Sequence, residues 1–153
     1  MSDIVLSHIE NGVRTISLNR PSRLNAINAE LLEAFKRALS EANDDDHTKV
    51  IILRGEGRAF CAGDDLKEFD QQVGNEPETR AYIESIQDIT REMVLGEKMI
   101  VGAIHGWAAG GGLEWMINSD LVILAKNTRW FFPEISLGFF VTGAVTTLLP
   151  KLV

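Results

Sequence analysis

The stretch W-A-A-G-G-G-L-E-W-M-I-N-S-D at residues 107–120 decides the fold, because three consecutive glycines join a strand to a helix. The apolar run before it, Met99–Ile104, predicts a buried strand, and residues 111–118 predict a short helix. Glycines leave backbone N–H groups open to a ligand oxygen, and a helix N-terminus adds partial positive charge. The stretch therefore suits an anion or a developing oxyanion, with Glu114 one turn into the helix.

A purely structural turn is the alternative, since a glutamate in the first turn of a helix also suits the helix dipole. Two other ligand motifs are not supported. The glycine spacing is not G-x-G-x-x-G, and no Gly-Lys-Ser/Thr follows, which argues against a dinucleotide fold and a P-loop.

Length and composition predict one domain over residues 1–153, since the chain has 153 residues and 45% of them are hydrophobic. The net charge of -7 argues against a nucleic-acid partner. The single cysteine, Cys61, excludes an intramolecular disulfide and indicates a reducing compartment. We recognise neither a signal peptide nor an apolar run long enough to span a membrane, so we expect no membrane partner and a cytoplasmic location.

Strands and helices alternate along the chain. Residues 4–10 and Val13–Leu18 flank Asn11-Gly12, which is typical of a hairpin. Asn28 is expected to cap a helix whose apolar face holds Leu31, Leu32, Phe35, Ala38, Leu39 and Ala42. Further strands are predicted at residues 50–53, 121–125 and 128–132. Helical segments are predicted from residue 66, over residues 78–95 and from residue 146, with a polar loop at residues 71–77. This order predicts an α/β fold of repeated ββα units with largely buried strands.

A second glycine-bearing turn lies at residues 60–67, F-C-A-G-D-D-L-K, where a strand again ends before a helix start. Two such turns can direct two N–H donors at one oxygen, as in the oxyanion holes of acyl-transfer and enolate chemistry. The alternative is that Asp64 and Asp65 only cap a helix.

Glu114 and Glu134 both lie near the triple glycine in sequence. Paired carboxylates in a partly apolar pocket can divide acid and base roles, because burial and mutual repulsion raise one pKa. The alternative for Glu134 is an exposed loop position, the commoner place for a glutamate. No His/Cys/Asp spacing resembles a metal site, and Cys61 has no evident His partner in sequence.

Four motifs in this order resemble the crotonase family, also called the enoyl-CoA hydratase/isomerase superfamily. They are N-R-P at residues 19–21 with L-N-A at 24–26, R-A-F-C-A-G-D-D-L-K-E at 58–68, residues 106–114, and F-P-E at 132–134 with L-G at 137–138. The resemblance runs from the first hairpin to Val153. It implies a spiral of ββα units and an acyl-CoA thioester as ligand, with coenzyme A as part of the substrate and no permanently bound cofactor.

By position, the resemblance assigns the two oxyanion-hole N–H groups to Asp64 and Gly111, and the two catalytic carboxylates of family hydratases to Glu114 and Glu134. In this assignment Glu114 activates water and Glu134 exchanges a proton with the α-carbon, whereas family isomerases rely on the carboxylate matching Glu134. Acyl-CoA contacts are assigned to Arg23, Leu24, Ala62, Gly63, Asp64, Asp65, Leu66, Lys67, Gly110 and Gly111.

The sequence departs from the family in two places. Residues 139–145, F-F-V-T-G-A-V, replace a Pro-Gly-rich segment that shapes the acyl pocket. Family members also continue into further helices that contribute to the CoA site and the trimer contact, and this C-terminal helical region is absent from the chain. We therefore expect exposed apolar surface around residues 139–149, and association into a homo-oligomer, a trimer or hexamer.

The resemblance favours an enoyl-CoA hydratase-type lyase that adds water to a 2-enoyl-CoA. The alternatives on the same scaffold are an enoyl-CoA isomerase and an acyl-CoA hydrolase. From another class, the alternative is a non-catalytic fragment that binds acyl-CoA or mediates oligomerisation.

Overall fold

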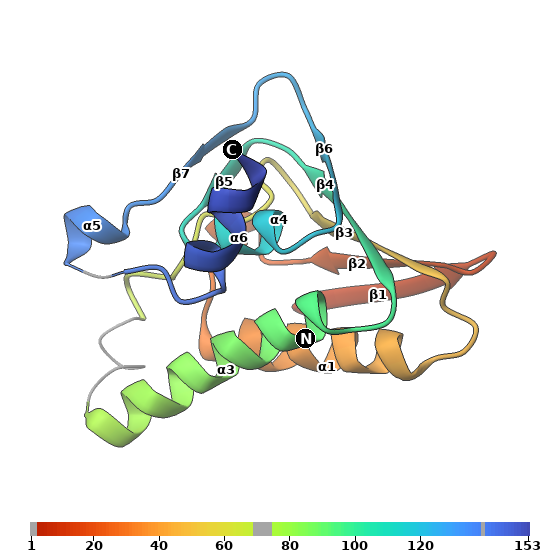
Figure 1. The fold of residues 1–153 in the computed structure, drawn as a ribbon, viewed down its shortest axis with the longest axis horizontal. Helices are drawn as coiled ribbons and strands as arrows, with labels where there is room; N and C mark the ends of the chain where they lie inside the picture. Colours follow the sequence, from red (N-terminus) through yellow and green to blue (C-terminus); the bar gives the residue numbers. More distant parts are fainter. Residues whose placement is uncertain (1–2, 69–74, 139) are drawn as a thin grey trace.

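Two β-sheets organise the chain in the computed structural model, which describes residues 3–68, 75–138 and 140–153 (Figure 1). The larger sheet has the strand order β1-β2-β3-β4-β6. Its first two strands form the predicted antiparallel hairpin, and the other neighbours run parallel. The strand bounds are β1 Val5–Glu10, β2 Val13–Leu18, β3 Val50–Gly55, β4 Met99–Ile104 and β6 Leu121–Leu124.

The second, smaller sheet and two isolated bridges are formed by segments that follow strands of the larger sheet in the chain. Strands β5 (Trp107–Ala109) and β7 (Arg129–Phe131) pair in parallel, and single bridges join Ile27 to Asp64 and Cys61 to Ala108. The helices are η1 Pro21–Arg23, α1 Ala29–Asp44, α3 Glu76–Val94, α4 Gly111–Ile117, α5 Glu134–Leu137 and α6 Val145–Leu152. The predicted α/β class with repeated ββα units is confirmed.

Helix α1 forms as its sequence predicts. The Asn28 side chain caps it by accepting a hydrogen bond from the Leu31 N–H at 3.0 Å. All six apolar residues expected on one face of the helix are buried. Helix α3 runs beside α1 in Figure 1, and the two are joined by an ion pair between Lys36 and Asp88.

The main core lies between the larger sheet and these helices. Phe35 of α1 and Trp115 of α4 are both fully buried, with ring centroids 4.7 Å apart. A smaller cluster joins Leu113 and Ile117 of α4 to Val145 of α6. Helix α4, which follows the triple glycine, therefore packs against α1 through Trp115 and against α6 through Leu113 and Ile117.

Some expectations differ from the structure. Sequence patterns did not predict β5, because its three residues are fixed by pairing to distant segments. Helix α3 begins at Glu76, so the last two residues of the expected loop 71–77 are helical, with Asn75 as the cap. The chain from Leu66 to Glu68 forms a turn, while residue 69 and residues 71–74 lie outside the described residues.

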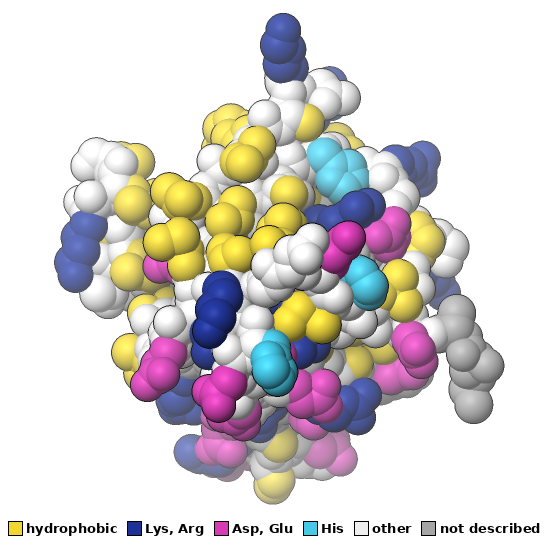
Figure 2. Space-filling model, turned by 90° about the vertical axis from the view of Figure 1, so that its right-hand side faces the viewer, with side chains coloured by type: hydrophobic (Ala, Val, Ile, Leu, Met, Phe, Trp, Pro, Cys, Tyr) yellow, Lys and Arg dark blue, Asp and Glu magenta, His cyan; other side chains and the backbone are white. Residues whose placement is uncertain are grey.

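Exposed apolar side chains are distributed over several segments, and they include all four residues of β6, two residues of β7 and Phe140. All four residues of β6, the strand at the edge of the larger sheet, are exposed. In the stretch expected to be exposed, Phe140 is exposed but Val145 is buried, and residue 139 lies outside the described residues. Figure 2 shows hydrophobic side chains gathered on the upper part of one face, above many charged side chains. Within the described ranges, no helix is both long and apolar enough to cross a membrane.

Candidate active site

A cavity of about 390 Å³ opens between α3, the N-terminus of α4 and the segment from β7 to α5. Seven of the residues that the sequence singled out line it: Ala62, Asp64, Leu66, Gly110, Gly111, Glu114 and Glu134. The remaining walls are mainly apolar side chains: Ile27, Ile83, Ile86, Trp115, Phe131, Pro133 and Phe140. Tyr82, Thr79 and Thr142 complete the lining.

The two glycine-bearing turns are fixed to each other at this cavity. The N–H of Cys61 donates to the Trp107 carbonyl, and the N–H of Ala109 donates to the Cys61 carbonyl, both at 3.0 Å. Gly63 has a φ of +86°, and a Cβ there would lie 2.8 Å from the Ala109 carbonyl oxygen. A larger residue at position 63 would therefore push the turns apart.

The amides of Asp64 and Gly111 belong to these two turns and line the same cavity. Neither N–H donates to a backbone carbonyl in the part of the chain that the structure describes. Burial raises the pKa of the Asp64 carboxyl group, while hydrogen bonds from Tyr82 and from the residue's own N–H oppose this shift. A ligand oxygen that binds this N–H would compete with the side chain.

Glu114 projects from the first turn of α4 and is only 3% exposed. Its Oε1 accepts a hydrogen bond from the Thr142 N–H at 2.8 Å. Burial raises the pKa of Glu114 above its ordinary value, while the N–H groups of Gly143 and Thr142 oppose this shift. The charges of Glu134 and Asp64 raise the pKa further, since like charges disfavour ionisation.

Glu134 opens helix α5 and faces the cavity from the other side of Gly110. A Cβ built on Gly110 would lie 2.8 Å from Glu134 Oε1, so the carboxyl group packs closely against the Gly110 backbone and leaves no room for a side chain at position 110. Its Oε2 is buried and has no hydrogen-bond partner among the described residues. Burial is the main reason why the pKa of Glu134 is raised, and the charge of Asp64 adds to it.

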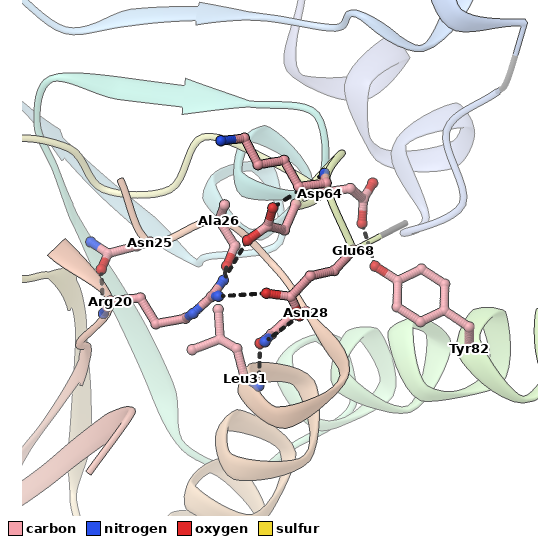
Figure 3. A network of polar contacts seen from close by, with 10 residues as sticks. Arg20, Asn25, Ala26, Asn28, Leu31, Asp64, Glu68 and Tyr82 are labelled. Carbon is pink, nitrogen blue, oxygen red and sulfur yellow. Dashed lines mark hydrogen bonds and ion pairs between the residues drawn. The ribbon is translucent and has the colours of Figure 1, made fainter. Parts of the chain in front are cut away.

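Two site residues missed by the sequence patterns are Tyr82 and Thr142. Tyr82 lies in the helix predicted over residues 78–95, and its hydroxyl donates to Asp64 Oδ1 (Figure 3). Thr142 contributes a backbone N–H, which carries no side-chain signal in the sequence. Burial raises the pKa of Tyr82, so its hydroxyl stays protonated.

Five residues assigned to acyl-CoA binding lie outside this cavity: Arg23, Leu24, Gly63, Asp65 and Lys67. Asp65 is buried and pairs with Arg20 at 3.1 Å, while the Arg20 guanidinium also reaches Glu68 (Figure 3). This network ties the turn that carries Asp64 to the segment before α1. The Asp65 carboxylate therefore has a structural role in this protein.

Leu24 lines a second, more polar cleft with a volume of about 630 Å³. Three cationic residues line it as well: Arg58, Lys126 and Arg129. The Arg129 guanidinium lies 5.3 Å from the centre of the Trp107 ring, in a cation–π contact. The Leu24 carbonyl accepts a hydrogen bond at 3.1 Å from the N–H of Ala62, which lines the first cavity.

No group of three or more His, Cys, Asp or Glu side chains in the described part of the chain is arranged to hold a metal ion. Cys61 is fully buried, as expected of a small core residue, and burial raises the pKa of its thiol to about 12.

Comparison with known proteins agrees with this geometry. The model of the enoyl-CoA hydratase/isomerase family matches residues 8–153. The 1,2-epoxyphenylacetyl-CoA isomerase of Escherichia coli K12 is 33% identical, over 99% of this chain and 58% of its own length. The short-chain-enoyl-CoA hydratase of Clostridium acetobutylicum is 31% identical, over 100% of this chain and 58% of its own length.

Solved structures give the same result. The crystal structure of an enoyl-CoA hydratase from Bacillus anthracis superimposes with a TM-score of 0.90 at 32% identity, covering 98% of this chain and 58% of that one. The chain thus spans a little over half the length of these relatives. It belongs to the enoyl-CoA hydratase/isomerase family, and its fold is the crotonase fold of that family.

Proposed function

We propose that the complete protein is a hydratase-type lyase that adds water to the double bond of a 2-enoyl-CoA thioester. One observation carries this proposal: two carboxyl groups, Glu114 and Glu134, line one cavity together with the amides of Asp64 and Gly111. Named hydratases among the relatives support it as well.

In this proposal the thioester oxygen binds the N–H groups of Asp64 and Gly111, which stabilise the negative charge that develops on it. Glu114 takes a proton from water as the water oxygen bonds to the β-carbon. Glu134 gives a proton to the α-carbon, so the double bond becomes a C–O and a C–H bond. Burial raises the pKa of both carboxyl groups, but backbone N–H groups oppose the shift at Glu114, whereas Glu134 Oε2 has no hydrogen-bond partner among the described residues. This difference supports the proposed division of roles.

The cationic cleft supports coenzyme A as the carrier. Arg58, Lys126 and Arg129 suit the phosphate groups of a nucleotide, in a chain whose net charge is -7. The hydrogen bond between Ala62 and Leu24 places one residue of the first cavity beside one residue of this cleft. A thioester that spans both would use Ala62, Leu66 and Leu24 from the expected set of contacts.

The test is hydration of a short 2-enoyl-CoA by the complete natural protein, followed by loss of the absorbance of the conjugated thioester. Saturable turnover supports the proposal. Binding of the CoA ester without turnover would instead favour the non-catalytic alternative.

Isomerisation is the second candidate, because one relative is named an isomerase and Glu134 alone can shuttle a proton. Product analysis distinguishes the two reactions, since migration of the double bond adds no water.

We also propose self-association, and the exposed apolar residues of the edge strand β6 support it. Sedimentation of the complete protein as a monomer at micromolar concentration would contradict this.

A further inference from the structure

The side chains of Asp64 and Tyr82 meet at the cavity, although the proposed hydration uses neither of them. Asp64 comes from the turn that follows Gly63, and Tyr82 comes from helix α3. The Tyr82 hydroxyl donates a hydrogen bond to Asp64 Oδ1 (Figure 3). Asp64 and Tyr82 therefore contribute polar groups to a part of the cavity lining that is otherwise made of the apolar side chains of Ile83, Ile86 and Leu66.

The carboxyl groups that line the cavity make its lining acidic. Asp64, Glu114 and Glu134 contribute three carboxyl groups, and no Lys, Arg or His is among the described lining residues. A carboxylate on a bound acyl group would lose its hydration next to these acids and find no cationic partner. A carboxylate that loses its hydration without a cationic partner is disfavoured, so such acyl groups should be rejected.

The Asp64 carboxylate can still accept hydrogen bonds. Its two oxygens offer about four lone-pair sites. The Tyr82 hydroxyl and the residue's own N–H use two of them. Tyr82 shows that an O–H group reaches this carboxylate inside the cavity, and the hydroxyl of an acyl group offers the same donor.

We propose that the Asp64–Tyr82 pair determines specificity, selecting acyl groups that bear a hydroxyl group and rejecting acyl groups that bear a carboxylate. This inference rests on the proposed acyl-CoA function. It concerns the side chain of Asp64, whereas the proposed oxyanion contact concerns its backbone N–H.

Three CoA esters test the pair: a short 2-enoyl-CoA, its analogue with a hydroxyl group at the far end of the acyl chain, and its analogue with a carboxylate there. The kcat/KM of each is measured with the complete protein, beside calorimetric binding of the corresponding saturated esters. The variants are Asp64→Asn and Tyr82→Phe. Ser85→Ala is the matched control, because it removes a hydroxyl from the same helix but away from the cavity.

The wild-type protein should favour the hydroxylated ester over the unsubstituted one by about 10-fold, the effect of one hydrogen bond to a charged group. It should disfavour the carboxylate ester by about 100-fold. Asp64→Asn should reduce both preferences, Tyr82→Phe should change the hydroxyl preference, and Ser85→Ala should change neither.

The outcomes separate the two proposals. Equal use of all three esters by the wild-type protein, or unchanged preferences in Asp64→Asn, would overturn the specificity role and leave the hydratase proposal standing. If the esters bind without turnover, the ratios of their binding constants replace the ratios of kcat/KM as the test of the specificity role. If no CoA ester binds, the acyl-CoA function itself fails, and the specificity role fails with it.

Discussion

Replacing Glu114 with glutamine tests the proposed chemistry most directly, because the change removes a base and keeps the shape of the side chain. The glutamine oxygen can still accept the Thr142 N–H that lies 2.8 Å from Glu114 Oε1. Its NH₂ group would face the Gly143 N–H, which then loses its acceptor, at a local cost of about 1–3 kcal/mol. Relief of a buried charge offsets that cost, so the fold should persist.

The expected loss in hydration is about 10²–10⁴-fold, the usual contribution of a general base. This corresponds to about 3–5 kcal/mol of activation free energy. Exchange of the α-proton with solvent should be retained, because Glu134 is proposed to carry that proton. The first readout is loss of the conjugated thioester absorbance, and the second is deuterium incorporation at the α-carbon of a saturated acyl-CoA.

Glu84→Gln is the matched control, because Glu84 is exposed on α3 and does not line the cavity. It should leave both rates unchanged. Full hydratase activity in Glu114→Gln would refute the base role. Equal loss of hydration and exchange would show that Glu114 also serves the α-carbon or holds the site together.

Glu134→Gln should lower both hydration and α-proton exchange by at least about 10²-fold, and an unchanged exchange rate would remove Glu134 from the reaction. Phe35→Ala should lower the free energy of unfolding by about 3–5 kcal/mol in urea denaturation, because Phe35 is fully buried against Trp115; a loss below 1 kcal/mol, on the order of a surface substitution, would contradict that packing. Folding raises the pKa of Glu114, so the stability that its protonated form contributes is lost as pH rises from the ordinary glutamate value through the raised one. The Tm of the wild-type protein should therefore fall relative to that of Glu114→Gln over this range, and parallel Tm curves would disprove the shift.

Local sequence signals predicted the hairpin and helix α1 because their causes are local. A turn sequence, a capping asparagine and an apolar stripe act over a few residues, and Asn28 illustrates this with its bond to Leu31. The two glycine turns were recognised for the same reason. Both turns line one cavity, and their action as a shared oxyanion hole stays a prediction.

Non-local contacts explain what the sequence could not predict. Strand β5 exists because Cys61 and β7 flank it, and neither partner is near it in the chain. Asp65 matched a binding motif, but Arg20 engages its carboxylate. The sequence predicted a strand at residues 121–125 in a fold of largely buried strands, yet all four side chains of β6 are exposed, since exposure depends on which distant segments cover the strand.

The parallel order β2-β3-β4-β6 has a consequence for how quickly the chain reaches this fold. Each parallel neighbour joins only after a long crossover has closed, with α1 between β2 and β3 and α3 between β3 and β4. The entropy of closing these loops is lost before the strand pairs form, which makes folding slow for a chain of this size. Strand edges remain unpaired during that interval, so refolding competes with intermolecular pairing, and dilute protein at low temperature should give the higher yield.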